Sequence, residues 1–295
     1  MTVQKQTLQI RCKNNKKTLN IAPGSTLSEV FNASGVQMNH GPVCARINNK
    51  VEGLHYRLYH NKDVEFLDMT SEPGSRNYTR TLFFILCKAV HDIYKRSRVI
   101  IDIPVSNGFY VNLQIGHPVE LEDVDQIRRR MQQIIDAAYP ILRYEVPTEE
   151  AVRMFEERGD MAKVKLLKSA GKLYTTYYKI DDYVDYYYGS LLTNTRDIYL
   201  FGLEKYFDGA LLRIPAVKKP DVLPEMTHQD KMFGVFKEHH HWQDIVGIRT
   251  VGDFNELVDK GMATDIINVS EALQEKRISE IADEIASRKG VKLVL

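Results

Sequence analysis

The sequence has no long apolar run: nowhere in its 295 residues does a hydrophobic stretch approach the ~20 residues that a membrane-spanning helix needs. Met1 to Leu19 mixes lysine and asparagine with short apolar alternations, so it lacks the apolar centre of a secretory signal. Hydrophobic residues make up 43% of the chain and charged residues 27%, which is typical of a globular protein in water. We therefore expect no membrane partner and a cytoplasmic location.

Cysteine is also scarce. The chain has three cysteines, Cys12, Cys44 and Cys87, which are far apart and form no CxxC pair. An odd number at such spacing argues against a disulfide framework and against a thiolate zinc site. A reducing compartment fits this pattern best.

The sequence has almost no net charge, because 40 Lys and Arg residues stand against 39 Asp and Glu residues. It therefore lacks the overall positive field of a strongly basic nucleic-acid binder, and only local patches could contact phosphate. Charge runs on helices are usually solvated faces, which is the simpler interpretation here. The candidate phosphate contacts are Arg128, Arg129, Arg130, Arg143, Lys163, Lys165 and Lys168.

Two catalytic motifs are missing. The only GK pair, Gly171 and Lys172, is followed by Leu173 and has Leu166 where a phosphate-binding GxxxxGK[ST] loop needs its first glycine. Without that loop, its lysine and a Mg²⁺ ligand, residues 1–295 cannot transfer phosphate. No GxSxG elbow is present either, which disfavours a serine hydrolase.

One histidine cluster, His239 to His241 beside Trp242, suggests a metal site. Adjacent residues on a helix point in different directions, and no second cluster lies at a suitable spacing. A partly exposed, histidine-rich helix end is the simpler interpretation, so we predict no metal.

Residues 1–70 have the element order of a β-grasp domain. An asparagine turn closes a hairpin, a Pro-Gly pair ends the second strand, and Ser25 or Thr26 can cap a short helix. Packing Leu27, Val30 and Phe31 onto the strands would bury one helix face. The expected elements are strands Thr7–Cys12 and Thr18–Ile21, a helix to about Ser34, and strands Val43–Ile47 and Val64–Leu67.

Residues 77–225 predict a larger α+β domain, after a linker at Ser71–Asn77 that is rich in serine, proline and glycine. Helices and strands interleave here without a βαβ rhythm. The expected elements are helices Thr81–Tyr94, Leu121–Ala138 and one opening at Thr148, and strands Val99–Pro104, Phe109–Ile115, Tyr174–Ile180, Asp197–Leu203 and Gly209–Ile214.

Residues 226–290 predict a helical connector, whose last helix would begin at Asn268 with Glu271 in a capping box. Residues 291–295 are apolar and predict a strand. An exposed unpaired strand is an aggregation hazard, so we expect this strand to be the first of a further domain.

Three blocks of sequence resemble the two N-terminal modules of threonyl-tRNA synthetase and together cover most of residues 1–215. The first comprises IAPGSTLSEVF, VCARINNKVEGLHYRL and VEFLD, and is similar to a TGS-type β-grasp domain. The second is IPVSNGFYVNL and the third is YYGSLLTNTRDIYLFGL, which are both similar to the synthetase's editing module. The resemblance implies a β-grasp domain followed by an editing-like α+β domain.

The residues that the editing chemistry needs are absent from this sequence. The family hydrolyses mischarged tRNA with an HxxxH pair and a CxxxH pair, which fall here on Arg80 and Phe84, and on Tyr187 and Leu191. None of these side chains offers the imidazole or thiolate that metal binding or proton transfer at this site would use. We therefore predict no catalytic residue and no turnover of mischarged tRNA.

The same module implies a pocket that could still bind a small-molecule ligand through converging polar and aromatic groups. In the alternative and slightly favoured interpretation, Phe84 and Leu191 have filled this pocket with core. The candidate residues are Arg80, Ser106, Asn107, Gly108, Tyr110, Tyr187, Ser190 and Asn194.

Val269–Leu295 is similar to the entry into the P-loop domain of nucleoside kinases that resemble uridine kinase. This resemblance implies a non-catalytic accessory region whose partner is its own kinase domain, and ATP and Mg²⁺ as cofactors of that domain alone. The alternative is an RNA- or tRNA-binding module with a degenerate editing site. The sequence leaves open whether the chain forms a homo-oligomer.

Overall fold

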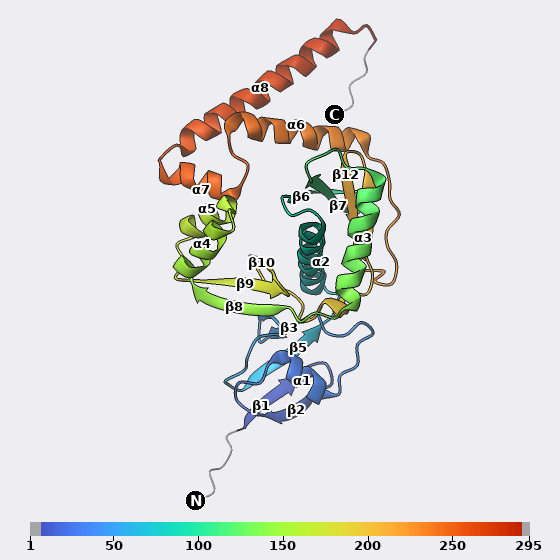
Figure 1. The fold of residues 1–295 in the computed structure, drawn as a ribbon, viewed down its shortest axis with the longest axis vertical. Helices are drawn as coiled ribbons and strands as arrows, with labels where there is room; N and C mark the ends of the chain where they lie inside the picture. Colours follow the sequence, from blue (N-terminus) through green and yellow to red (C-terminus); the bar gives the residue numbers. More distant parts are fainter. Residues whose placement is uncertain (1–6, 291–295) are drawn as a thin grey trace, which may run out of the picture. The chain divides into compact units, whose positions relative to one another are not determined.

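The structure is a computed structural model that describes residues 7–290, apart from the side chains at positions 102, 239 and 241. The described chain divides into two compact units (Figure 1). The first contains residues 7–144 and 176–229, and the second contains residues 145–175 and 230–290. Separate sheets and helices alternate along the chain, which confirms the α+β class. The domain boundaries at residues 70, 77, 225 and 290 stay predictions.

The first part of unit one is the predicted β-grasp fold. Its sheet has the order β2-β1-β5-β3-β4, in which β1 and β5 are parallel and the other pairs are antiparallel. Helix α1 (Leu27–Ser34) begins at Thr26, which forms a capping box with Glu29. Leu27 and Val30 are fully buried against the sheet. The strands are β1 (Leu8–Cys12), β2 (Lys17–Ile21), β3 (Cys44–Ile47), β4 (Lys50–Gly53) and β5 (Lys62–Leu67).

Strand β4 was not predicted, because two of its four residues are exposed and it has no apolar alternation. The other strands and α1 confirm the predicted elements to within two residues.

The second part of unit one is built on α2 (Glu72–Ile93), α3 (Leu121–Asp136) and a sheet of order β11-β12-β7-β6. The hairpin of β6 and β7 is closed by Ser106 and Asn107, whose φ values of 53° and 55° suit a tight two-residue turn. Apolar residues of both helices and of the sheet form one core cluster. The strands are β6 (Arg98–Val105), β7 (Gly108–Gln114), β11 (Gly202–Tyr206) and β12 (Gly209–Arg213).

The predicted linker at Ser71–Asn77 is wrong, because this segment forms the first turns of α2. Ser71 caps the helix by accepting a hydrogen bond from the Gly74 amide at 3.2 Å, and Pro73 lies in the first turn. A side chain at Gly74 would meet the Asp68 carbonyl oxygen at 1.9 Å, so glycine is needed there. Serine, proline and glycine mark a helix start here.

The predicted strand at Asp197–Leu203 begins late. A short 3-10 helix, η1 (Thr195–Asp197), precedes an extended segment, and β11 pairs with β12 only from Gly202. Sequence alternation did not distinguish extended backbone from paired strand.

A third sheet has the order β10-β9-β8, so β8 (Leu142–Pro147) is at an edge. β9 (Tyr174–Ile180) pairs antiparallel with β10 (Tyr183–Asp185). The chain passes between the two units within β8 and again within β9.

Unit two is helical, as predicted for the C-terminal part of the chain. Among residues 7–290, no helix has both the length and the apolar character needed to cross a membrane. The helices of unit two are α4 (Thr148–Glu157), α5 (Met161–Ser169), α6 (Asp230–Val246), α7 (Val251–Asp259) and α8 (Ala263–Ser287).

The predicted start of the last helix at Asn268 is wrong, because α8 begins at Ala263 and Asn268 lies inside it. No residue of α8 is buried within the described chain. The strand predicted at residues 291–295 lies outside the described residues.

Candidate functional site

The candidate site lies along one face of α2, where residues spaced three or four apart share a side of the helix. Segment 187–192 runs beside this face. The Ser190 hydroxyl donates to Asn77 Oδ1 at 3.1 Å, and Arg80 Nη1 donates to the Ser190 carbonyl at 3.1 Å. One turn further along, the Leu192 amide donates to Thr81 Oγ1 at 2.9 Å. These bonds tie the third sequence block to the helix that carries the HxxxH-equivalent positions.

The positions that carry the family's catalytic groups are occupied here mainly by core residues. Phe84 and Leu191 are 0% exposed and belong to the main apolar cluster. The Tyr187 ring lies 5.4 Å from the Phe84 ring, edge to face. In the described chain, no three His, Cys, Asp or Glu side chains come together in a way that could hold a metal ion. These positions supply neither a metal ligand nor a general base.

Arg80 is the polar member of this set. Its half-buried guanidinium lies over Gly189, where a Cβ atom would come within 2.0 Å of Arg80 Nη1. Gly189 also has a φ of +111°, which side chains rarely adopt. Burial lowers the pKa of Arg80 from its ordinary value, and the nearby Tyr178 partly offsets this effect. The site therefore presents one cation to segment 187–192.

Tyr187 cannot act as a base at neutral pH. Burial raises the pKa of its hydroxyl well above the ordinary tyrosine value, and the Cys87 thiol beside it adds to this increase. Cys87 lies one turn beyond Phe84 on α2 and was not predicted as a site residue. Cys87 lies seven residues, or two helical turns, after Arg80, and this spacing was the signal in the sequence that could have identified it.

The predicted residues of the β6–β7 turn have other partners. The Ser106 hydroxyl accepts a hydrogen bond from the Thr227 amide at 2.7 Å, and the Ser106 amide donates to Gln229 Oε1 at 3.0 Å. Asn107 and Gly108 complete the tight turn. These contacts hold the segment after β12 against the hairpin.

Tyr110 and Asn194 also have local structural roles. The Tyr110 hydroxyl donates to Asp208 Oδ1 at 2.6 Å, and its side chain is 4% exposed. Asn194 caps η1 by accepting from the Arg196 amide, and its own amide donates to the Ala138 carbonyl.

Of the predicted residues, the structure brings together Arg80, Tyr187 and Ser190 along α2. The Ser106–Gly108 turn, Tyr110 and Asn194 are hydrogen-bonded elsewhere in the first unit. A ligand held by the whole predicted set remains a prediction.

Two polar residues beside the site, buried Asn77 and half-buried His55, were not predicted. Asn77 is 2% exposed, and its Nδ2 has no hydrogen-bond partner among the described residues. His55 Nε2 lies 2.6 Å from the Ile141 carbonyl oxygen, so this nitrogen donates a hydrogen bond. The buried Nδ1 atom of His55 has no hydrogen-bond partner among the described residues. Burial lowers the pKa of His55 despite the bond to Ile141, which favours the neutral ring.

His55 belongs to the β-grasp fold, and that fold meets segment 187–192 through Gly53, where a Cβ would lie 2.5 Å from Ser190 Cβ. The residues at this contact include donors such as Arg80 and Asn77, and among the described residues here no nucleophile is hydrogen-bonded to a base. They can bind a polar group and have no evident means of cleaving one.

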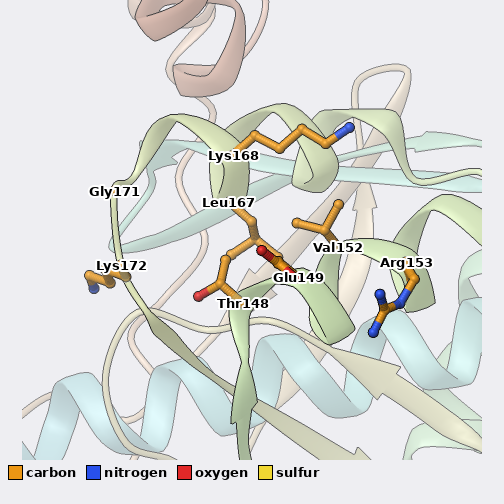
Figure 2. Close-up of a pocket in the computed structure, with 8 residues that line it drawn as sticks. All are labelled: Thr148, Glu149, Val152, Arg153, Leu167, Lys168, Gly171 and Lys172. Carbon is orange, nitrogen blue, oxygen red and sulfur yellow. The ribbon is translucent and has the colours of Figure 1, made fainter.

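A separate cavity of about 440 Å³ lies between α4 and α5 in the second unit (Figure 2). Thr148 and Glu149 lie between the two helices below Leu167, and Lys168 extends away along its helix. The lining carries one carboxylate, Glu149, and three cationic side chains, Arg153, Lys168 and Lys172. None of the predicted pocket residues lines this cavity, although Lys168 was among the candidate phosphate contacts. The cavity is formed by Thr148, Glu149, Val152, Arg153, Leu167, Lys168, Gly171 and Lys172.

Most of the cations considered as phosphate contacts are near carboxylates. These pairings support the interpretation of solvated helix faces. The Arg143 guanidinium donates to Thr176 Oγ1 at 3.0 Å. The pairs are Arg128 with Asp125, Arg129 with Glu122, Arg130 with Asp92, Lys163 with Asp160, Lys165 with Asp253, and Lys168 with Glu156.

The chain is similar to known threonine–tRNA ligases. It is 29% identical to the enzyme of Acetivibrio thermocellus over 181 residues, which is 61% of this chain and 28% of the relative. It is 30% identical to that of Symbiobacterium thermophilum over 144 residues, 49% of this chain and 22% of the relative. It is 29% identical to that of Syntrophotalea carbinolica over 227 residues, 73% of this chain and 36% of the relative.

No protein-family model matches the chain. The chain spans between 22% and 36% of the length of these three relatives. The comparisons confirm the resemblance to threonyl-tRNA synthetases for part of the chain.

The identification of the chain with a uridine kinase or another nucleoside kinase is wrong, because the relatives are threonine–tRNA ligases. The kinase interpretation depended on the tandem of N-terminal modules and on the similarity of the last helix and strand, and residues 291–295 lie outside the described structure. ATP and Mg²⁺ were expected only for a domain beyond Leu295, and they stay a prediction.

Proposed function

We propose that this chain is an RNA-binding module, related to threonine–tRNA ligases, that retains an editing-like fold without editing chemistry. The similarity to these ligases supports the RNA part of the proposal. The burial of Phe84 and Leu191 in the core supports the loss of hydrolysis. The chain would hold RNA, and any chemistry on that RNA would belong to other residues.

The electrostatics predict modest affinity. The net charge is +1, and most of the candidate cations are near carboxylates, so few phosphates can be neutralised. If about three phosphates are contacted, the affinity should fall about 40-fold when salt rises from about 50 to about 200 mM. Such a module would bind RNA measurably only at low salt.

Filter binding of labelled tRNA at these two salt concentrations tests the RNA part. We expect saturable binding at the lower concentration and a strong decrease at the higher one. An absence of binding at low salt would refute the proposal.

A second assay tests the loss of chemistry. tRNA charged with the wrong amino acid is incubated with the chain, and we expect the ester to decay at the rate seen in buffer. Faster decay that disappears in the Arg80→Ala variant would show that a reactive site survives, and would contradict the non-catalytic part alone. A small-molecule ligand for the Arg80 site and a homo-oligomer stay predictions.

A further inference from the structure

Two tyrosine rings lie stacked on the surface of the third sheet. Tyr144 on β8 and Tyr177 on β9 have ring centroids 5.2 Å apart and an interplanar angle of 18°. Tyr144 is 38% exposed, and Tyr177 is partly exposed. The strands are neighbours in one sheet, so the ring pair is held on a rigid support. Both residues belong to the first unit.

Strand alternation separates the two faces of this sheet. Tyr178 and Ile180 are 1% and 0% exposed and belong to the main core. On β9 the opposite face carries Tyr177 and Lys179, and on β8 the residue that shares the face of Tyr144 is Leu142, which is 44% exposed. We call Leu142, Tyr144, Tyr177 and Lys179 the tyrosine face.

The charge near the tyrosine face is suited to phosphate. Lys179 is partly exposed two residues from Tyr177, on the same face of the strand. Arg143 precedes Tyr144 on the edge strand β8 and donates to Thr176 Oγ1, so it lies with Thr176 on the opposite face of the sheet. The ring pair therefore has one cation, Lys179, on its own face of the sheet.

We infer that the tyrosine face binds an unpaired stretch of RNA, whose bases stack on Tyr144 and Tyr177 while Lys179 contacts its phosphates. This inference rests on the proposed RNA binding and names the surface and the form of RNA. Aromatic rings presented by a sheet can stack with any unpaired base, because every base has a π face. A duplex keeps its bases stacked on one another, so it offers no such face.

Fluorescence anisotropy with a labelled oligouridine and with a labelled RNA duplex tests the inference on the full chain. We expect the wild type to bind the single strand more tightly than the duplex. Tyr144→Leu and Tyr177→Leu keep apolar volume but lose the ring, and each should weaken single-strand binding about tenfold or more. Tyr144→Phe and Tyr177→Phe keep the ring and should bind as the wild type does.

A matched control is Tyr59→Leu, which removes a 60% exposed tyrosine from the β-grasp fold and should leave binding unchanged. Lys179→Gln should reduce the salt slope for single-stranded RNA by about 0.7. Circular dichroism establishes that each variant is folded.

The outcomes separate the two proposals. If the wild type binds RNA and the leucine variants bind equally well, the tyrosine face is not the site, while RNA binding stands. If the wild type binds neither tRNA nor oligouridine at low salt, both proposals fail. If the leucine variants instead abolish a concentration-dependent dimer in sedimentation, with RNA binding intact, the face is a contact between copies and the inference is overturned.

Discussion

Lys88 provides a direct test of how the core of the first unit tolerates charge. Its side chain on α2 is 1% exposed. Its Nζ atom lies 2.9 Å from Asp182 Oδ1, 3.1 Å from Asp92 Oδ1 and 3.6 Å from Asp181 Oδ2. The perturbation is Lys88→Met, which keeps a similar length and apolar stem and removes only the charge.

The size of the effect follows from the exposure of the carboxylates left behind. Removing one partner of a buried ion pair costs about 3 to 5 kcal/mol. Asp181 and Asp182 are 54% and 67% exposed and can regain water, and Asp92 keeps Arg130 at 2.7 Å. We therefore expect Lys88→Met to lower the free energy of unfolding by about 2 to 3 kcal/mol.

The effect should depend on pH in a defined way. The hydrogen bond from Lys88 lowers the pKa of Asp182. The contribution of Asp182 to the free energy of unfolding is therefore fully present above the ordinary aspartate pKa, about 3.9, and is lost as the pH falls through the lower folded-state value. Burial opposes the charge of Lys88, but its bonds to Asp182 and Asp92 outweigh burial and raise its pKa. That contribution is present below about pH 10.4 and is lost as the pH rises through the folded-state value.

Urea unfolding followed by far-ultraviolet circular dichroism measures the difference, provided that the slope m is unchanged. Lys50→Met is the matched control, because Lys50 is 82% exposed and its Nζ lies 2.7 Å from Glu52, a surface pair expected to contribute less than about 1 kcal/mol. The difference between wild type and Lys88→Met should be constant between about pH 5 and pH 9 and should decrease below about pH 4. A loss no larger than that of Lys50→Met, or one equal at acidic and neutral pH, would refute the reasoning.

Three further predictions concern the region around α2. Gly189→Ala should lower the free energy of unfolding by about 1 to 3 kcal/mol in urea titrations, since φ is +111° there and the new methyl group would displace Arg80; unchanged stability would contradict this. Phe84→Ala should cost about 3 to 5 kcal/mol in the same assay, because the ring is fully buried, whereas an exposed catalytic-type position would tolerate it. Burial raises the pKa of the Cys44 thiol to about 12. This thiol should therefore not react with a thiol reagent near neutral pH until urea unfolds the chain. Rapid reaction of Cys44 in the folded protein would disprove its burial.

Local sequence signals were sufficient for much of the fold. The sequence predicted a cap at Ser25 or Thr26, and Thr26 begins α1, because a cap depends on neighbouring residues alone. The same signals failed at Ser71, where a cluster typical of linkers begins a long helix. A cap and a linker use the same residue types, and only the packing of the residues after them distinguishes the two.

The candidate site required the tertiary structure. The motif comparison identified Arg80 and Ser190, and their hydrogen bond connects elements far apart in the sequence. It also grouped Tyr110 with them, whose side chain the alternation of β7 puts on the face opposite to Val111 and whose hydroxyl donates to Asp208. A shared role for Tyr110 and Arg80 stays a prediction.

The sequence by itself determined the β-grasp fold and the absence of imidazole and thiolate at the family's catalytic positions. The tertiary structure alone decided that Lys88 is buried among carboxylates and that Tyr144 stacks on Tyr177. The physical reason is that a residue type and its local spacing are properties of the chain, whereas burial and strand register depend on contacts between distant segments.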